Sequence, residues 1–205
     1  LSSKTNNLLN DQLTNSDVIN VLLKISSLVT TDSPLFDVLK KIHLYISSVI
    51  DVPNIAIAQA DLSTHEMTLD YFIDEKDGSV FQGKTVSIKD GLSSYVFNQG
   101  LPTLLNETDI LQLQSDGTVA KVHGSLCKSW IGVPIKHEEE TLGIIIVQSY
   151  CQSVVYNERD LEILSFVASN ISTLLKQRQL SERELESKKA LEKSLEVITQ
   201  KNTEI

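Results

Sequence analysis

The last quarter of the chain, residues 156–205, contains neither proline nor glycine, and this constrains the fold more than any other feature. Both residue types interrupt helices, so their absence over such a length predicts one continuous α-helix. Glu158, Asp160 and Glu162 lie in the expected first turns, where the helix dipole favours negative charge. At 1.5 Å per residue this helix would extend about 75 Å, far beyond the width of a small domain. Part of it must therefore project from the body of the domain.

Apolar residues within this helix recur at alternating intervals of four and three residues, which is typical of coiled coils. Residues 181–205 carry mixed charges and too few apolar residues for a globular core, so this half needs a partner helix. We therefore predict a parallel homodimer joined by this helix. The predicted interface residues are Leu164, Ala168, Ile171, Leu175, Leu191, Leu195 and Ile198. The apolar stripe changes phase near Leu185–Leu191, which predicts a local register break, or stammer.

The rest of the chain combines helical and strand patterns. Apolar spacing of three and four residues predicts helices at 17–30, 34–50 and 91–98. Alternation predicts strands at 55–60, 67–73, 85–88, 101–105, 130–135 and 142–150. Short turns join two strand pairs into antiparallel hairpins, so the predicted class is α+β, with an antiparallel sheet covered by helices on one face. Residues 106–127 fit neither pattern.

Acidic residues are concentrated in residues 51–120, which contain 11 Asp and Glu against 3 Lys and Arg. The whole chain has a formal net charge of −9. Nucleic acids and anionic membranes bind clustered basic residues, so we expect neither as a partner. The sequence has no apolar run of about 18 residues and no signal-peptide profile, so we expect no membrane contact and a cytoplasmic location. It begins with Leu1, and we interpret it as a piece of a longer protein.

Cys127 and Cys151 lie outside any CxxC pattern. Reduced thiols in a cytoplasmic protein are the expected state, with a redox or covalent-cofactor role as the alternative. His123 precedes Cys127 by four residues, a spacing that places both on one face if this segment is helical and could serve metal ligation. The four histidines otherwise fall in separate elements, so we expect no metal site, and no particular cofactor is indicated.

Enzyme signatures are missing from the sequence, which contains no GxSxG, P-loop, HExxH or GxGxxG pattern in a suitable context. We therefore expect a protein without catalytic activity. Asp74, Glu75 and Asp77 follow the second predicted strand, but the later ligands of a calcium-binding loop are absent. We interpret these acids as a solvated loop.

Aromatic residues are the candidate ligand-binding residues, because aromatic side chains commonly line small-molecule sites. They are Tyr71, Phe72, Tyr95 and Trp130. The alternative for Trp130 is a large core residue whose indole N–H bonds a backbone acceptor. Tyr71 and Phe72 are adjacent in a predicted strand, so they point to opposite faces and at most one of them faces a given pocket.

Three segments in combination resemble GAF domains. GLSSYVFNQGLPTLLNE (Gly91–Glu107) resembles their Gly-Leu-x-x-x-Val-x-x-x-Gly-x-Pro segment. KSWIGVPIKHEEETLGIIIVQSY (Lys128–Tyr150) resembles their paired central strands, and YNERDLEILSFVASNISTLL (Tyr156–Leu175) resembles their closing helix. LDYFIDEKDG (Leu69–Gly78) is similar to a subset found in bacterial signalling proteins. The resemblance covers about residues 18–178.

This resemblance implies a five- or six-stranded antiparallel sheet with a small-molecule pocket between the sheet and its covering loops. It also implies dimers built from the first and last helices, with the last helix continuing into an output domain. On this basis the chain divides into an N-terminal extension (1–16), a GAF sensor domain (17–178) and a coiled-coil linker helix (179–205).

The function that the resemblance implies is sensory and non-catalytic. The domain would bind a small effector, dimerise, or both, and signal to a GGDEF or GGDEF-EAL unit that makes or degrades cyclic di-GMP. A histidine-kinase sensor and a ligand-free dimerisation spacer are the alternatives. A GAF-fold methionine sulfoxide reductase would require Cys127 and Cys151 to lie close together. Leu161 replaces the Glu of cyclic-nucleotide-binding members, and Cys127 lacks the following His of bilin-binding members.

Overall fold

The structure, a computed structural model, describes residues 15–30 and 32–203, with side chains described as far as residue 194. The predicted extension at residues 1–16 therefore lies almost wholly outside the described residues. The helices are α2 (Asn15–Leu28), α3 (Leu35–Ile46), α4 (Leu92–Gln99), α5 (Glu107–Ser115) and α6 (Glu158–Thr203). The strands are β1 (Asn54–Asp61), β2 (Glu66–Ile73), β3 (Thr85–Ser87), β4 (Thr103–Asn106), β5 (Ser129–His137) and β6 (Glu140–Ser149).

A six-stranded antiparallel sheet forms the centre of the fold, in the order β3-β2-β1-β6-β5-β4. The two predicted hairpins are present as β1–β2 and β5–β6, and they meet where β1 pairs with β6. The edge strands β3 and β4 are short, which limits the unpaired backbone that could recruit another sheet. The predicted α+β class is therefore confirmed, with six strands.

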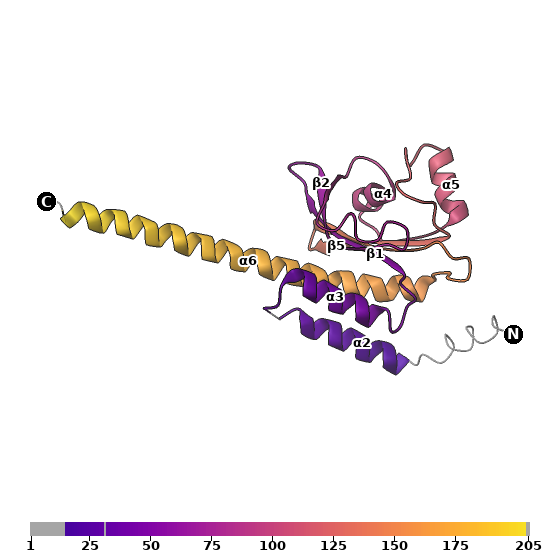
Figure 1. The fold of residues 1–205 in the computed structure, drawn as a ribbon, viewed down its shortest axis with the longest axis horizontal. Coiled ribbons are helices and arrows are strands. Elements are labelled where there is room, and N and C mark those ends of the chain that lie inside the picture. Colours follow the sequence, from indigo (N-terminus) through magenta and orange to yellow (C-terminus); the bar gives the residue numbers. More distant parts are fainter. Residues whose placement is uncertain (1–14, 31, 204–205) are drawn as a thin grey trace.

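Helices lie on both faces of this sheet (Figure 1). α3 and α6 pack on one face of the sheet, α2 packs against these two helices, and all three share one buried apolar cluster with that face. α4 and α5 lie over the opposite face, where a second apolar cluster includes residues from both helices. We call these the helix-covered face and the cavity face.

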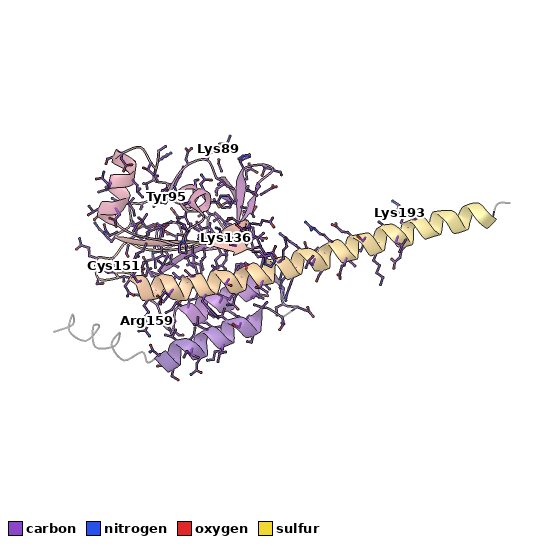
Figure 2. The ribbon with its side chains drawn as sticks, turned by 180° about the vertical axis from the view of Figure 1, so that it is seen from behind. Lys89, Tyr95, Lys136, Cys151, Arg159 and Lys193 are labelled. Atoms are coloured by element: carbon purple, nitrogen blue, oxygen red, sulfur yellow. The ribbon has the colours of Figure 1, made fainter. Side chains whose placement is uncertain are left out.

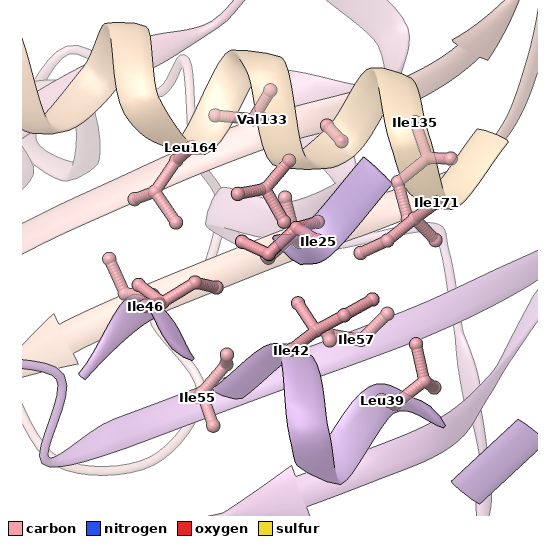
Figure 3. Packing of buried hydrophobic residues seen from close by; sticks show 14 of the residues in the cluster. Ile25, Leu39, Ile42, Ile46, Ile55, Ile57, Val133, Ile135, Leu164 and Ile171 are labelled. Atoms are coloured by element: carbon pink, nitrogen blue, oxygen red, sulfur yellow. The ribbon is translucent and has the colours of Figure 1, made fainter. Parts of the chain in front are cut away.

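Strand alternation builds the core of the helix-covered face. Ile55 and Ile57 of β1 and Val133 and Ile135 of β5 point toward α3 and α6, as Figure 3 shows. β6 contributes buried side chains to both faces, because Ile145 belongs to the helix-covered core and Ile144 to the apolar cluster of the cavity face. The strand is therefore buried on both sides.

Four of the predicted dimer-interface residues belong to this core. Leu164, Ala168, Ile171 and Leu175 are 1%, 2%, 0% and 3% exposed, and they pack against the chain's own sheet and helices. Their assignment to a dimer interface is therefore corrected, because a four-three stripe fits any apolar surface, including a sheet of the same chain. Leu191 is 61% exposed, whereas the side chains of Leu195 and Ile198 lie outside the described residues.

α6 leaves the body of the domain after about residue 180 and continues as one helix (Figure 1). All side chains from Ser181 to Ser194 are exposed, and Figure 2 shows Lys193 on this projecting part. Lys176 forms a 3.1 Å ion pair with Glu140, and Arg178 Nη2 donates to the Ser33 carbonyl oxygen, near the point of departure. The helix predicted for 156–205 is therefore present at Glu158–Thr203. Its backbone remains helical through Leu185–Leu191, where the sequence predicts a stammer.

Residues 106–127, which fit no pattern in the sequence, contain α5 and an irregular segment. α5 begins with a capping box: Asn106 Oδ1 accepts from the Asp109 backbone N–H, and Asp109 Oδ2 accepts from that of Asn106. The Asn-x-x-Asp spacing was the available signal for this helix.

The central pairing of β1 with β6 depends on Gly143. A Cβ atom at this position would lie 2.0 Å from the carbonyl oxygen of Ala58 and 3.1 Å from the Cα of Gln59. Both contacts are with backbone atoms, which cannot move without separating the strands.

We expect Gly143→Ala to lower the free energy of unfolding by roughly 3 kcal/mol or more, because the added methyl group forces the two central strands apart. Urea denaturation followed by circular dichroism measures this loss. Gly117→Ala is the matched control, because Gly117 has a φ of 80° but open space around its Cβ position. Its cost should be about 1 kcal/mol. An equal, small loss in both variants would contradict the proposed backbone clash.

Candidate ligand-binding cavity

A cavity of about 550 Å³ lies on the cavity face, between the sheet and the start of α4. Its floor is apolar and comes from β1, β2, β5 and β6. Ala56 and Ala58 have small side chains and leave room above β1. The other apolar floor residues include Met67, Leu69, Phe72, Trp130, Ile144 and Ile146.

Trp130 forms part of this floor and is the single tryptophan of the chain. A Cβ atom at Gly132 would lie 2.2 Å from Cη2 of its indole ring, so the ring lies across the space that a side chain at 132 would fill. Trp130 is 2% exposed yet borders the cavity, so its fluorescence should report on any occupant.

The structure separates the four candidate aromatic residues. Phe72 and Trp130 line the cavity. Tyr71 lies on the helix-covered face, where its hydroxyl is 2.9 Å from Nδ1 of His43, so its assignment to the ligand site is corrected. Tyr95 packs on α4 against the apolar cluster and is not among the lining residues. Adjacent strand residues point to opposite faces, which explains the different positions of Tyr71 and Phe72.

One end of the cavity is polar and is built around Asp74, which is 4% exposed. Asp74 Oδ2 accepts from Nε2 of Gln148 (3.0 Å) and from the hydroxyl of Tyr150 (2.9 Å). Asp74 Oδ1 accepts from the backbone N–H groups of Lys76 (2.8 Å) and Asp77 (3.1 Å).

The prediction of a solvated loop after β2 is confirmed for Glu75 and Asp77, which are exposed, and is wrong for Asp74. Asp74 is buried in the cavity wall, and the Glu75 backbone N–H donates to Oδ1 of Asn54 at 2.6 Å. The sequence does not distinguish these acids from a surface loop, because the partners of Asp74 on β6 and beyond lie more than 70 positions away.

The hydrogen bonds to Asp74 favour the ionised form of its carboxyl group. Burial alone raises the pKa of this carboxyl, but the four donors together outweigh that effect and lower its pKa below the ordinary value of an aspartate. Burial and the neighbouring Asp74 raise the pKa of Tyr150, which therefore stays protonated and donates. At neutral pH this end of the cavity carries an ionised carboxylate that is fully hydrogen-bonded.

The cover of the cavity comes from the start of α4 and the irregular segment near residues 122–127. The His123 ring packs against the backbone of Gly91, just before α4. Lys128 Nζ lies 2.7 Å from the carboxylate of Glu107 and ties α5 to the start of β5. These contacts position the segment that the sequence pattern left unassigned.

Cys127 and His123 both line the cavity. Burial raises the pKa of the Cys127 thiol to about 11, so it is protonated at neutral pH. Cys151 is exposed and is also a free cysteine. Among residues 15–30 and 32–203 the structure has no group of three or more His, Cys, Asp and Glu arranged to hold a metal ion.

The sequence model of the GAF domain family matches residues 35–175, well over half of the chain. The chain belongs to the GAF domain family. This confirms the resemblance, and the six-stranded sheet with its long C-terminal helix is the GAF fold. No curated protein sequence matches the chain significantly. Among the described helices, none is both long and apolar enough to cross a membrane.

Solved structures similar to this GAF domain come from proteins of different kinds. The GAF domain of an Acinetobacter phosphoenolpyruvate-protein phosphotransferase has a TM-score of 0.65 and 15% identity, over 82% of this chain and 97% of that chain. Free methionine-R-sulfoxide reductase from Neisseria meningitidis has a TM-score of 0.61 and 16% identity, over 83% and 96%. The GAF domain of a Bacillus halodurans two-component sensor histidine kinase has a TM-score of 0.55 and 14% identity, over 73% and 98%. At these identities the likeness establishes the fold alone.

We expect Asp74→Asn to lower the free energy of unfolding at pH 7 by roughly 2–3 kcal/mol, because hydrogen bonds to a charged acceptor are lost in a buried site. Since the folded pKa of Asp74 is below its unfolded value, its stabilising contribution is present above about pH 4 and disappears as the pH falls through the folded pKa. The difference between wild type and variant should therefore shrink toward pH 3. Denaturant titrations at pH 7 and pH 3 measure both quantities.

Asp37→Asn is the control, because Asp37 is exposed on α3 and lies on the other face of the sheet. This variant should have nearly wild-type stability at both pH values. An Asp74→Asn effect that is equally large at pH 3 would contradict a role for the ionised carboxylate.

Proposed function

We propose that this GAF domain is a non-catalytic, cytoplasmic sensor module that binds a small effector in the cavity of the cavity face. The observation that carries this proposal is the cavity of about 550 Å³, with an apolar floor and a fully hydrogen-bonded polar end. Small-molecule sites usually have this size and this combination of apolar surface with a few fixed polar groups.

Strand β5 connects the proposed site to α6. Trp130 faces the cavity, whereas its neighbour Ile131 is fully buried in the core that includes α6. The Tyr156 backbone N–H, just before α6, donates to Oγ of Ser129 at 3.0 Å. A ligand that shifts Trp130 would therefore move residues that pack directly against the signalling helix.

We propose that α6 passes this change to an output domain of the GGDEF or GGDEF-EAL type, which makes or degrades cyclic di-GMP. A histidine kinase is the alternative output, supported by the likeness to the GAF domain of the Bacillus halodurans kinase. A dimerisation spacer without a ligand is the remaining alternative, and the open cavity favours the sensor over it.

We also propose a parallel homodimer formed through α2 and α6. These two helices contact each other and leave apolar side chains exposed, although the stripe that packs on the sheet is not available. The exposed residues are Ile19 and Leu23 on α2, and Phe166, Leu180, Leu185 and Leu191 on α6. A partner helix packed along α2 and α6 would bury these side chains.

The cysteines do not support a reductase function like that of the Neisseria enzyme. Cys127 lines the cavity, but its raised pKa disfavours the nucleophilic thiolate. Cys151 is exposed and is not among the lining residues. The thiols therefore do not face the same site.

A thermal-shift screen of small metabolites tests the sensor proposal. A ligand at one hundred times its Kd adds about 2.7 kcal/mol to the stability, so wild-type protein should show a clear rise in Tm. Ala58→Phe fills the cavity from β1 and should abolish that rise, whereas Ala190→Phe on the exposed part of α6 should retain it. The sensor proposal is wrong if no metabolite shifts the wild type, or if Ala58→Phe responds equally.

Light scattering on the purified domain at tens of micromolar should give the mass of a dimer. The double variant Phe166→Glu, Leu180→Glu should give a monomer, because two charges per chain would be buried in the proposed interface. Leu44→Glu is the control, since Leu44 is 61% exposed on α3 and lies outside that interface. A monomeric wild type, or an equal effect of Leu44→Glu, would contradict the proposed dimer.

A further inference from the structure

The charged residues that line the cavity are nearly all acidic. They are Asp74, Asp77 and Asp90, and the lining contains one histidine, His123. Within the part of the chain that the structure describes, the lining includes neither lysine nor arginine. The side chains that line the cavity therefore favour a cationic ligand over an anionic one.

The polar end already holds one cation. The ammonium group of Lys76 lies 3.9 Å from the centroid of the Tyr150 ring, which is the geometry of a cation–π contact. Tyr150 donates its hydroxyl hydrogen to Asp74, so the ring and the carboxylate act on the same region. Lys76 is exposed and does not line the cavity, so a ligand's ammonium can take this place only by displacing the Lys76 side chain into solvent.

The carboxylate of Asp74 has four donors, two on each oxygen. These contacts fix its position and keep it ionised in a buried site, as a preorganised negative charge. Asp77 is exposed and lies beside it, at the mouth of the same end. A ligand can therefore contact the Asp77 side chain. Replacing this side chain would not create a cavity in the core, because Asp77 is exposed.

The rest of the cavity suits an apolar body. Phe72 and Phe81 lie in edge-to-face contact with ring centroids 5.5 Å apart, and both border the cavity. Trp130 and the small side chains of Ala56 and Ala58 complete a surface on which an aromatic ring can lie. This surface provides few polar partners, so it disfavours polyhydroxylated ligands.

We propose that the cavity selects a compact, largely apolar amine, with its hydrocarbon or aromatic body on the floor and its ammonium directed to the end formed by Asp74, Asp77 and Tyr150. The inference rests on the proposed sensor function and specifies its ligand class. Phosphate-bearing and carboxylate-bearing effectors are selected against, because three aspartates line the cavity and no described lysine or arginine does. The ammonium groups of Lys76 and Lys84 contact the lining rings of Tyr150 and Phe81 but do not line the cavity themselves.

Three matched probes test the ligand class: 4-phenylbutylamine, 4-phenylbutan-1-ol and 4-phenylbutyrate. They share an aromatic body and differ in charge. Isothermal titration at pH 7 and moderate salt, with Trp130 fluorescence as a second readout, gives a Kd for each. In the wild type we expect the amine to bind at least tenfold more tightly than the carboxylate, with the alcohol between them.

Asp77→Asn should reduce this preference at least threefold, because it removes one negative charge from the mouth without emptying the core. Asp37→Asn removes the same charge on the other face of the sheet and should leave the preference unchanged. The inference is overturned if the carboxylate binds as tightly as the amine, or if both variants reduce the preference equally.

The probes also separate this inference from the sensor proposal. If the probes bind without charge preference, the ligand class is wrong while binding in the cavity still supports a sensor. The same holds if no probe binds but a screened metabolite gives a shift that Ala58→Phe abolishes. If neither probes nor metabolites bind, both proposals are overturned.

Discussion

The antiparallel pairing of β1 with β6 is the interaction on which the rest of the structure depends. It joins two hairpins that lie far apart in the sequence, from the pair Asn54 and Gln148 to the pair Gln59 and Gly143. Closing such a long loop costs entropy that only a long ladder and its burial can offset. The same pairing decides which side chains face which layer: Ile57 and Ile145 are opposite each other in the helix-covered core, while Ala58 and Ile144 face the cavity.

Local patterns in the sequence predict most of the elements. The hairpins, the edge strand β4 and the long helix α6 follow from alternation, turn residues and the absence of Pro and Gly. Gly100, which directly follows α4, ends this helix in a left-handed conformation. α5 was missed because its capping signal, Asn106 and Asp109, precedes a helix with little apolar periodicity.

The site was less predictable, because it depends on contacts between distant segments. Strand alternation places Tyr71 and Phe72 on opposite faces of the sheet, but it does not predict which of them faces the cavity. That depends on which face α3 and α6 cover. In the sequence, Asp74 cannot be distinguished from a surface acid. Its hydrogen bonds come from Gln148 of β6 and from Tyr150, just after β6, and only the tertiary structure brings these residues to its side chain. The stripe at Leu164 and Ile171 has the spacing of a coiled coil, and only the tertiary structure shows that the chain's own sheet covers it.

The projecting part of α6 sets a geometric condition on whatever it is joined to. In a continuous helix each residue adds 1.5 Å of length and about 100° of rotation, so distance and angular phase cannot be changed independently. Between Ser181 and Ser194 no described neighbour of the same chain supports the helix, so it can act as a rigid shaft where a second helix packs against it, as in the proposed dimer. Inserting or deleting one residue there would turn the far end by more than a quarter turn, while a change of seven residues would nearly restore its direction. Natural variation in the length of this shaft should therefore favour steps of about seven residues.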